Sequence, residues 1–273
     1  MAVAAPATRR RRPGREDDMQ IIGNGFLAKN LATAFGDRFP EVTALAAGVS
    51  STSVTDPAEF DREAESLYAA LHKCAAQDLT LLYFSTASFA MYGHTDVPAR
   101  EDGPLFPPSA YGRHKLALEA CVRASGVRHV VLRLSHVVGP HQRPHQLLPA
   151  IVRQVGSGTV TVYRGAHRDL LDARDLMHAI DGLLLSDAGD VVVNVASGRP
   201  LPVEEIVDGV AARLGVAPDR VYLSGPFSRT EVSLERLRTL VPDFGTVTPV
   251  GDAGYLDLLL DRYLDRAVPA PTR

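Results

Sequence analysis

Short apolar runs alternate with amphipathic stretches along the chain, and this alternation predicts a parallel β-sheet covered by helices. The predicted strands occupy residues 20–22, 42–46, 79–84, 129–134, 159–163 and 191–195. The predicted helices occupy 27–35, a long stretch from Pro57, and then 109–125, 147–155, 172–185, 203–214 and 255–266. The run LTLLYF is apolar on both faces, as a central strand of a parallel sheet requires. The fold class is therefore α/β, a Rossmann-like doubly wound parallel sheet with a small C-terminal α/β lobe.

Small and polar residues follow the predicted strands, in the segments GNG, AAG, STAS, SHVVG and ASG. On parallel sheets of this kind, ligands bind outside the carboxyl ends of the strands. The clustering of these residues at one edge therefore predicts a ligand-binding cleft there.

The first strand runs directly into GNGFLA, which fits the G-x-G-x-x-G/A fingerprint of dinucleotide-binding loops. The first glycine permits a tight turn, the second lets the backbone approach a diphosphate, and the small last residue allows close packing of helix and strand. The helix N-terminus adds free N–H groups for the anion. Glycines also mark ordinary turns, so the loop gains its weight from its position between strand and helix.

Tyr111 and Lys115 stand four residues apart on one face of a predicted helix. An unperturbed tyrosine has a pKa of about 10, and a neighbouring ammonium group favours the phenolate and lowers that pKa. The pair would then exchange a proton with a carbonyl or an alcohol. An isolated YxxxK is more often a packed tyrosine beside a solvated lysine. Thr86, at the end of the buried strand, reverses this judgement because its hydroxyl could bond the same reacting oxygen.

Composition and charge exclude several classes of protein. The chain is 45% hydrophobic and 22% charged with a net charge of −3, which indicates a soluble globular protein without a general attraction to nucleic acid or membrane. No apolar run approaches the roughly 18 residues of a membrane span. Two cysteines make no disulfide framework, and the histidines lack ligand spacing, so no metal is expected. We expect a cytoplasmic location.

The chain is expected to form one structural unit. Residues 1–18, with the basic run Arg9–Arg12, are interpreted as a disordered extension or the product of an upstream start codon, with a nucleic-acid-binding arm as the alternative. Residues 19–140 are assigned to a cofactor-binding Rossmann-like part. Residues 141–273 are assigned to the rest of the Rossmann fold and a substrate-binding lobe.

From about Gln20 onward, the chain resembles the extended short-chain dehydrogenase/reductases of the NAD-dependent epimerase/dehydratase family. The resemblance rests on GNGFLA, YFSTAS and YGRHK, and also on LRLSHVVGP, VYRGAHRDLLDARDL and NVASG. It implies that Thr86, Tyr111 and Lys115 form the catalytic triad, with Lys115 also holding the nicotinamide ribose. The residues then expected to bind the cofactor are Gly23, Asn24, Gly25, Phe26, Leu27, Ala46, Ala47, Gly48, Ser85, Tyr111, Lys115 and Ser135. The residues expected to bind substrate are Ser88, His136, Arg168 and Ser197.

Two departures from the family pattern stand out. Only some twenty residues separate Gly25 from Gly48, where relatives have about sixty, so we expect that the second and third strands, which cradle the adenosine ribose, are missing or reduced. Asp37 and Glu41 are the only acidic candidates for the ribose hydroxyls, and both look like loop residues. The second departure is Ala87 and Ser88, which replace the Asp-Glu of the family's dehydratases and argue against dehydration.

Three functions remain open. The favoured one is an NAD(P)-dependent reductase, with a weak preference for NADP, acting on a ketone of a sugar nucleotide or of a secondary metabolite. The second is a sugar-nucleotide epimerase that uses tightly held NAD. The third is a non-catalytic cofactor-binding protein. By the resemblance we also expect a homodimer, formed through Phe60, Leu67 and Leu71 of one helix and Leu116, Ala120 and Cys121 of another.

Overall fold

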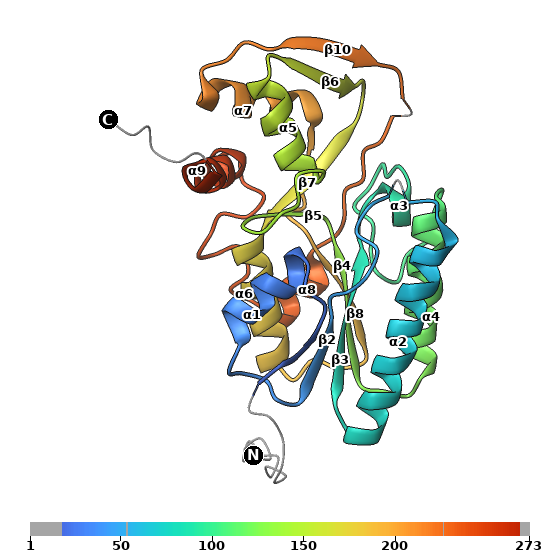
Figure 1. Ribbon diagram of the computed structural model, residues 1–273. Coiled ribbons are helices and arrows are strands. Elements are labelled where there is room, and N and C mark those ends of the chain that lie inside the picture. Colours follow the sequence, from blue (N-terminus) through green and yellow to red (C-terminus); the bar gives the residue numbers. More distant parts are fainter. Residues whose placement is uncertain (1–17, 53, 226, 268–273) are drawn as a thin grey trace.

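The central sheet has five parallel strands in the order β1-β2-β3-β4-β8 (Figure 1). The computed structural model describes residues 18–52, 54–225 and 227–267, so the basic run at Arg9–Arg12 lies outside the described residues. The strands are β1 (Gln20–Ile22), β2 (Val42–Leu45), β3 (Thr80–Thr86), β4 (His129–Leu134) and β8 (Val191–Val195). All residues of β2, β3 and β4 are buried, which confirms the expected central strands.

The sheet is shortened on the side of the glycine loop. Strand β1 pairs with β2, from Gln20 opposite Thr43 to Ile22 opposite Leu45, and has no second neighbour among the described residues. The expectation that strands are missing after the first βα unit is therefore confirmed. Glu41 precedes β2, and its carbonyl accepts from Thr80 N at the start of β3 (2.8 Å). Glu41 thus lies at the amino end of the strands, away from the ligand-binding edge.

Helices cover both faces of the sheet, as Figure 1 shows. Helices α2 (Pro57–Gln77) and α4 (Ala110–Ala124) cover one face, and α1 (Phe26–Phe35), α6 (Ala173–Leu185) and α8 (Glu235–Leu240) cover the other. On the α2 side, Leu67 and Leu71 are buried against the sheet. The prediction that these two leucines form a subunit interface is therefore wrong, because one sheet face already covers them.

The second lobe contains a three-stranded and a two-stranded sheet above the carboxyl edge of the main sheet (Figure 1). Its strands are β5 (His136–Val138), β7 (His167–Asp172) and β9 (Pro200–Pro202), and then β6 (Thr159–Tyr163) and β10 (Asp219–Leu223). Its helices are α5 (Leu147–Gly156), α7 (Val203–Leu214) and α9 (Tyr255–Ala267).

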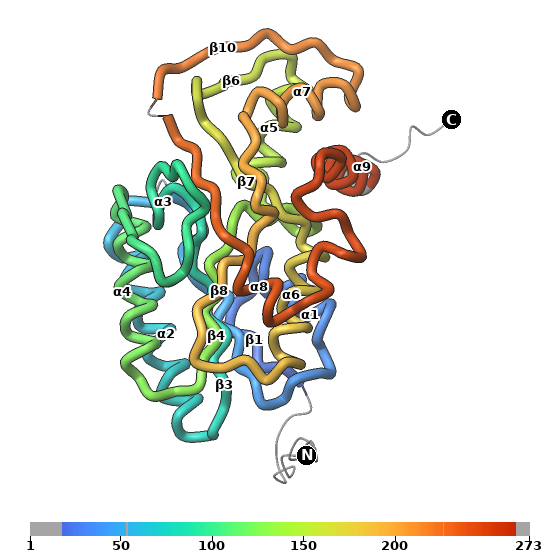
Figure 2. Tube along the Cα trace, turned by 180° about the vertical axis from the view of Figure 1, so that it is seen from behind, coloured from blue at the N-terminus to red at the C-terminus, as the bar shows by residue number. Residues whose placement is uncertain are grey.

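The segment 228–233 connects this lobe back to the main sheet. It pairs with the loop after helix α3 (Phe89–Tyr92), through Thr95 N to Arg229 O (3.1 Å) and an isolated bridge between Ala99 and Val232. Figure 2 shows the segment running down beside α3 toward α8. The two lobes are thus joined across the region where the predicted cleft opens.

Among the described residues, the helices are too short or too polar to cross a membrane. The same part of the chain contains no cluster of three or more metal-ligating side chains.

Candidate active site

Helix α4 begins with a tightly fixed first turn that carries Tyr111. The Ser109 side chain caps the helix by accepting from Gly112 N (3.1 Å). Gly112 packs so closely against α3 that a β-carbon built there would overlap the Ala90 carbonyl oxygen. Only glycine fits at this contact, and the contact sets where α4 starts relative to the carboxyl end of β3.

Thr86 lies beside Tyr111, and Ser88 lies beside Thr86. Strand β3 ends at Thr86, whose Oγ1 is 2.8 Å from Ser88 Oγ, and Ser88 caps α3 by accepting from Ala90 N. The Thr86 side chain also acts to lower the pKa of Tyr111. Hydroxyls from a strand end, a short helix and α4 therefore gather where the sequence predicts them.

Lys115 lies one turn further along α4 and is almost completely buried. Its Nζ donates to Glu63 Oε1 (2.5 Å) and to the Phe84 carbonyl oxygen (3.2 Å), and it lies 5.8 Å from the centre of the Tyr111 ring. The predicted proximity of Thr86, Tyr111 and Lys115 is thus present in the structure. Their catalytic roles stay predictions.

Glu63 of α2 is the feature of the site that the sequence reasoning missed. Its Oε2 accepts from Val49 N (2.9 Å) and lies 3.2 Å from His114 Nε2, while its Oε1 accepts from Tyr83 (3.2 Å) as well as from Lys115. The available signal was its position four residues before Leu67, on the apolar face of the long helix. A carboxylate on such a face needs a buried partner.

The pKa of Tyr111 is raised in this environment, although the sequence alone predicted a lowered one. Burial of the phenol is the main cause, and the Glu63 carboxylate adds to it. Lys115 and Thr86 act in the opposite direction without overcoming burial. The prediction from the sequence was wrong because it considered the Lys115 ammonium and not the burial of the phenol, to which the Glu63 carboxylate adds a smaller effect in the same direction.

The groups around Glu63 have a defined ionisation at neutral pH. Burial raises the pKa of Glu63, but Lys115 and the Val49 N–H outweigh it and the net pKa is lowered. Burial lowers the pKa of His114 despite the nearby carboxylate, so the ring is neutral. Because an ionised carboxylate only accepts, His114 Nε2 carries the hydrogen that it donates to Glu63.

The glycine loop fits a dinucleotide diphosphate. Gly23 has φ +133°, and a β-carbon there would lie 2.6 Å from the Ala46 carbonyl oxygen, so the loop passes very close to the end of β2. At Gly25, the N-cap of α1, a β-carbon would meet only the Arg143 guanidinium among the described residues, at 3.9 Å. The space above the first turn of α1, where Phe26 and Leu27 begin the helix, is therefore open to an anion.

The AAG segment after β2 lies between the glycine loop and the buried ion pair. Ala46 N donates to the Ile22 carbonyl oxygen (2.8 Å). A β-carbon at Gly48 would collide with Glu63 Oε1 and lie 2.9 Å from Lys115 Nζ. The backbone of this segment therefore covers the ion pair directly.

On the substrate side, His136 and Arg168 lie close together at the junction of the two lobes. Burial and the charge of Arg168 lower the pKa of His136 to about 3, so this ring is neutral. Burial also lowers the pKa of Arg168, whose Nη1 donates to the carbonyl oxygen of His167 (2.7 Å). The Ser135 hydroxyl is buried, and it acts to lower the pKa of Asp169.

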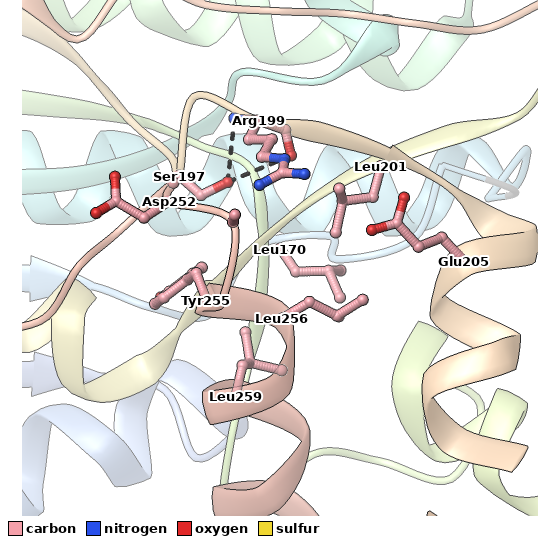
Figure 3. Close-up of a pocket in the computed structure, with 11 residues that line it drawn as sticks. Leu170, Ser197, Arg199, Leu201, Glu205, Asp252, Tyr255, Leu256 and Leu259 are labelled. Carbon is pink, nitrogen blue, oxygen red and sulfur yellow. Dashed lines mark hydrogen bonds between the residues drawn. The ribbon is translucent and has the colours of Figure 1, made fainter. Parts of the chain in front are cut away.

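Asp169 organises the ASG segment beneath these residues. Its carboxylate accepts from Ser197 N and Gly198 N, each at 2.8 Å, and burial raises its pKa. Ser197 also lines a small pocket in which leucine side chains from β7, β9 and α9 face one another (Figure 3). Tyr111 and Lys115 do not line this pocket, so it is separate from the triad.

Ser85 does not join the predicted cofactor site. Its hydroxyl donates to Glu119 (2.5 Å), and Glu119 also binds Arg133 (Nη2 to Oε2, 2.6 Å). Because successive strand residues point to opposite faces, Ser85 faces away from Phe84 and Thr86. The Ser85 side chain thus belongs to a buried polar network with Glu119 and Arg133.

The model of the NAD dependent epimerase/dehydratase family matches residues 3–196 of the chain. The chain is 30% identical, over 187 residues, to a UDP-glucose 4-epimerase of Azospirillum brasilense, a match that covers 57% of this chain and 52% of that protein. It is 32% identical, over 139 residues, to a dTDP-6-deoxy-L-talose 4-dehydrogenase (NAD(P)(+)) of Kitasatospora kifunensis, with coverage of 46% and 44%. The chain thus spans about half the length of these curated relatives.

The fold is similar to that of UDP-N-acetylglucosamine 4-epimerase from Methanobrevibacter ruminantium M1, solved in complex with UDP-N-acetylmuramic acid. The TM-score is 0.75 at 17% identity, covering 92% of this chain and 100% of that one. This likeness confirms the predicted fold class.

Proposed function

The chain belongs to the NAD-dependent epimerase/dehydratase family, and on that premise we propose that it is an NAD(P)-dependent reductase with Tyr111 as its proton donor. The proposed substrate is a ketone carried on a sugar nucleotide. Relatives named as epimerases and as a dTDP-deoxysugar dehydrogenase support this substrate class. A secondary-metabolite ketone is the alternative substrate.

One observation supports reduction of a ketone above oxidation of an alcohol: the raised pKa of Tyr111 beside Thr86. At neutral pH the phenol of Tyr111 carries the proton that reduction requires, and it can donate this proton to an oxygen on which charge develops. Oxidation of an alcohol would require the phenolate, which burial and the Glu63 carboxylate disfavour.

In the proposed reaction, a bound nicotinamide supplies the hydride that attacks the carbonyl carbon. The glycine loop with the first turn of α1 would hold the diphosphate, and Lys115 would hold a ribose hydroxyl. Tyr111 Oη donates its proton to the carbonyl oxygen as that oxygen becomes an alkoxide. Thr86 Oγ1 hydrogen-bonds the same oxygen and stabilises the developing charge.

Epimerisation is the second candidate, because several of the relatives are UDP-glucose 4-epimerases. An epimerase keeps its dinucleotide through the catalytic cycle, whereas a reductase exchanges it at each turnover. Strand β1 lies at the sheet edge, and no described carboxylate follows a second strand to bind the adenosine ribose. Weaker adenosine contacts favour exchange and therefore the reductase.

The two candidates are separated by the use of added cofactor. Purified protein is incubated with dTDP- and UDP-linked 4-keto-6-deoxyhexoses and either NADPH or NADH, and dinucleotide oxidation is followed by absorbance. In parallel, UDP-glucose is supplied without cofactor. The proposal predicts dinucleotide consumption equal to the ketone reduced. Conversion of UDP-glucose to its 4-epimer without added cofactor, by protein that copurifies with NAD, would contradict it.

A further inference from the structure

The Glu63 carboxylate accepts hydrogen bonds from donors on three separate parts of the fold. Its donors are the Val49 backbone after β2, Tyr83 on β3, and His114 and Lys115 on α4. The side chain is 1% exposed and that of Lys115 is 4% exposed, so water does not compete with this pair. The carboxylate is therefore fixed in one position beside the proposed catalytic groups.

We propose that Glu63 is a positioning residue that fixes the Lys115 ammonium and keeps Tyr111 in its protonated, proton-donating form. The proposal rests on the proposed function only in assigning proton donation to Tyr111. Its physical content, a carboxylate on α2 that controls the ionisation of a phenol on α4, is testable without substrate.

The contacts of Lys115 hold its ammonium group in one place. Lys115 has three N–H donors, of which one is directed to Glu63 Oε1 and another to the Phe84 carbonyl oxygen. One N–H remains for a ribose hydroxyl or for the Tyr111 oxygen. The backbone at Gly48 lies against both members of the pair, which prevents the ammonium from swinging toward β2.

The ionisation of Tyr111 depends on the charged and polar groups around it. The groups that face Tyr111 are Lys115 on its own helix, Glu63 on α2, and Tyr83 and Thr86 on β3. An unopposed buried ammonium would stabilise the phenolate, whereas a neutral ammonium–carboxylate pair leaves burial as the main influence on the phenol. His114 is neutral and adds no charge. The pKa of Tyr83 is raised well above its ordinary value by burial and by Glu63, so Tyr83 also stays protonated.

A purely structural ion pair would have a different consequence. Replacing Glu63 would then lower stability and leave the ionisation of Tyr111 in the folded protein unchanged. A direct titration of the Tyr111 phenol therefore distinguishes the structural role from the positioning role.

The test is an ultraviolet titration of tyrosinate in wild-type protein, Glu63→Gln, and Glu63→Gln combined with Tyr111→Phe. The matched control is Glu59→Gln, which removes an exposed carboxylate one turn earlier on α2. In Glu63→Gln we expect the phenolate of one tyrosine to form at a pH at least about one unit lower than in wild type. The control should follow the wild-type curve, and Tyr111→Phe should remove the early phenolate.

Superimposable curves for wild type and Glu63→Gln would overturn the proposal, as would an early phenolate that persists in the Tyr111→Phe double variant. A phenolate removed instead by Tyr83→Phe would assign the effect to the wrong tyrosine and would also overturn it. If Glu63→Gln does not fold, Glu63→Asp replaces it, because its shorter side chain withdraws the charge from Lys115. Glu63→Asp should shift the curve in the same direction by less, and no shift would refute the proposal.

The turnover of an identified substrate gives a second readout. In Glu63→Gln, the alkaline decline of kcat should move to lower pH, with KM for the ketone little changed. Wild-type protein that reduces no ketone would sink the proposed function. The titration would still decide the role of Glu63.

Discussion

Replacing Lys115 by methionine should reverse the pH dependence of stability around Glu63. The substitution removes a buried ammonium and keeps an apolar stem of similar length. It leaves the Glu63 carboxylate with the donors Val49 N, Tyr83 and His114 and no cation. Breaking a buried pair by removing one partner typically costs about 3–5 kcal/mol. Because three donors still hydrogen-bond the carboxylate, we expect a loss of stability near the lower end of this range, about 3 kcal/mol.

The sign follows from the pKa of Glu63. In wild type this pKa is lowered, so the carboxylate contributes stability that is present above its unfolded pKa of about 4.3 and is lost as pH falls. Without Lys115, burial, the largest influence on the group, raises the pKa instead. In Lys115→Met, Glu63 should therefore contribute stability below its unfolded pKa, and this contribution should be lost as pH rises through its pKa in the folded protein.

Urea unfolding at mildly acidic and mildly alkaline pH measures this difference. Lys115→Met should lose about 3 kcal/mol at alkaline pH, which lowers Tm by roughly 5–10 °C, and should recover part of the loss at acidic pH. Arg62→Met, which breaks the exposed pair with Glu59, is the control and should show the wild-type pH dependence. A constant difference between Lys115→Met and wild type across pH would refute the reasoning.

Three further predictions concern the cofactor loop, the α3–α4 contact and association. Gly25→Val should fold, since a β-carbon there meets only Arg143 among the described residues, yet it should weaken NADPH binding at least roughly tenfold by calorimetry. Unchanged affinity would show that the diphosphate does not bind at this loop. Gly112→Ala should displace α4 from α3 and lower both Tm and NADPH affinity, and a wild-type Tm would show that the contact relaxes freely. Light scattering should show a homodimer through the exposed face of α2 and α4, where Tyr68 contacts Cys121, and Tyr68→Glu should give monomers. A wild-type monomer would contradict this interface.

The central sheet and the triad were predictable because their signals are local. Strand β3 is a continuous buried run, and Tyr111 and Lys115 share one helical face. The short distance between the glycine loop and Gly48 predicted the edge position of β1, because a chain that short has no room for two further strands and a helix.

The missed elements depend on partners far away in the sequence. Strand β10 is mostly exposed and exists by pairing with β6, from Asp219 opposite Thr159 onward. Strand β9 contains prolines at both ends and pairs with β7. Glu63 was missed for the same reason, because its partners Val49, Tyr83 and Lys115 meet only in the folded chain. The raised pKa of Tyr111 was missed because it depends mainly on burial of the phenol in the folded protein.

Transfer of deuterium from NADPH labelled at nicotinamide C4 tests the proposed reduction most directly. Wild-type protein is incubated with the labelled dinucleotide and a nucleotide-linked 4-keto sugar, and the product is examined by mass spectrometry and NMR. We predict one deuterium on the carbinol carbon for each NADP⁺ formed, and a rate lower by about 10²–10⁴ in Tyr111→Phe. Recovery of the unreduced ketone with no deuterium in it and no NADP⁺ formed would contradict the account, as would a 4-epimer formed from UDP-glucose that is supplied without NADPH.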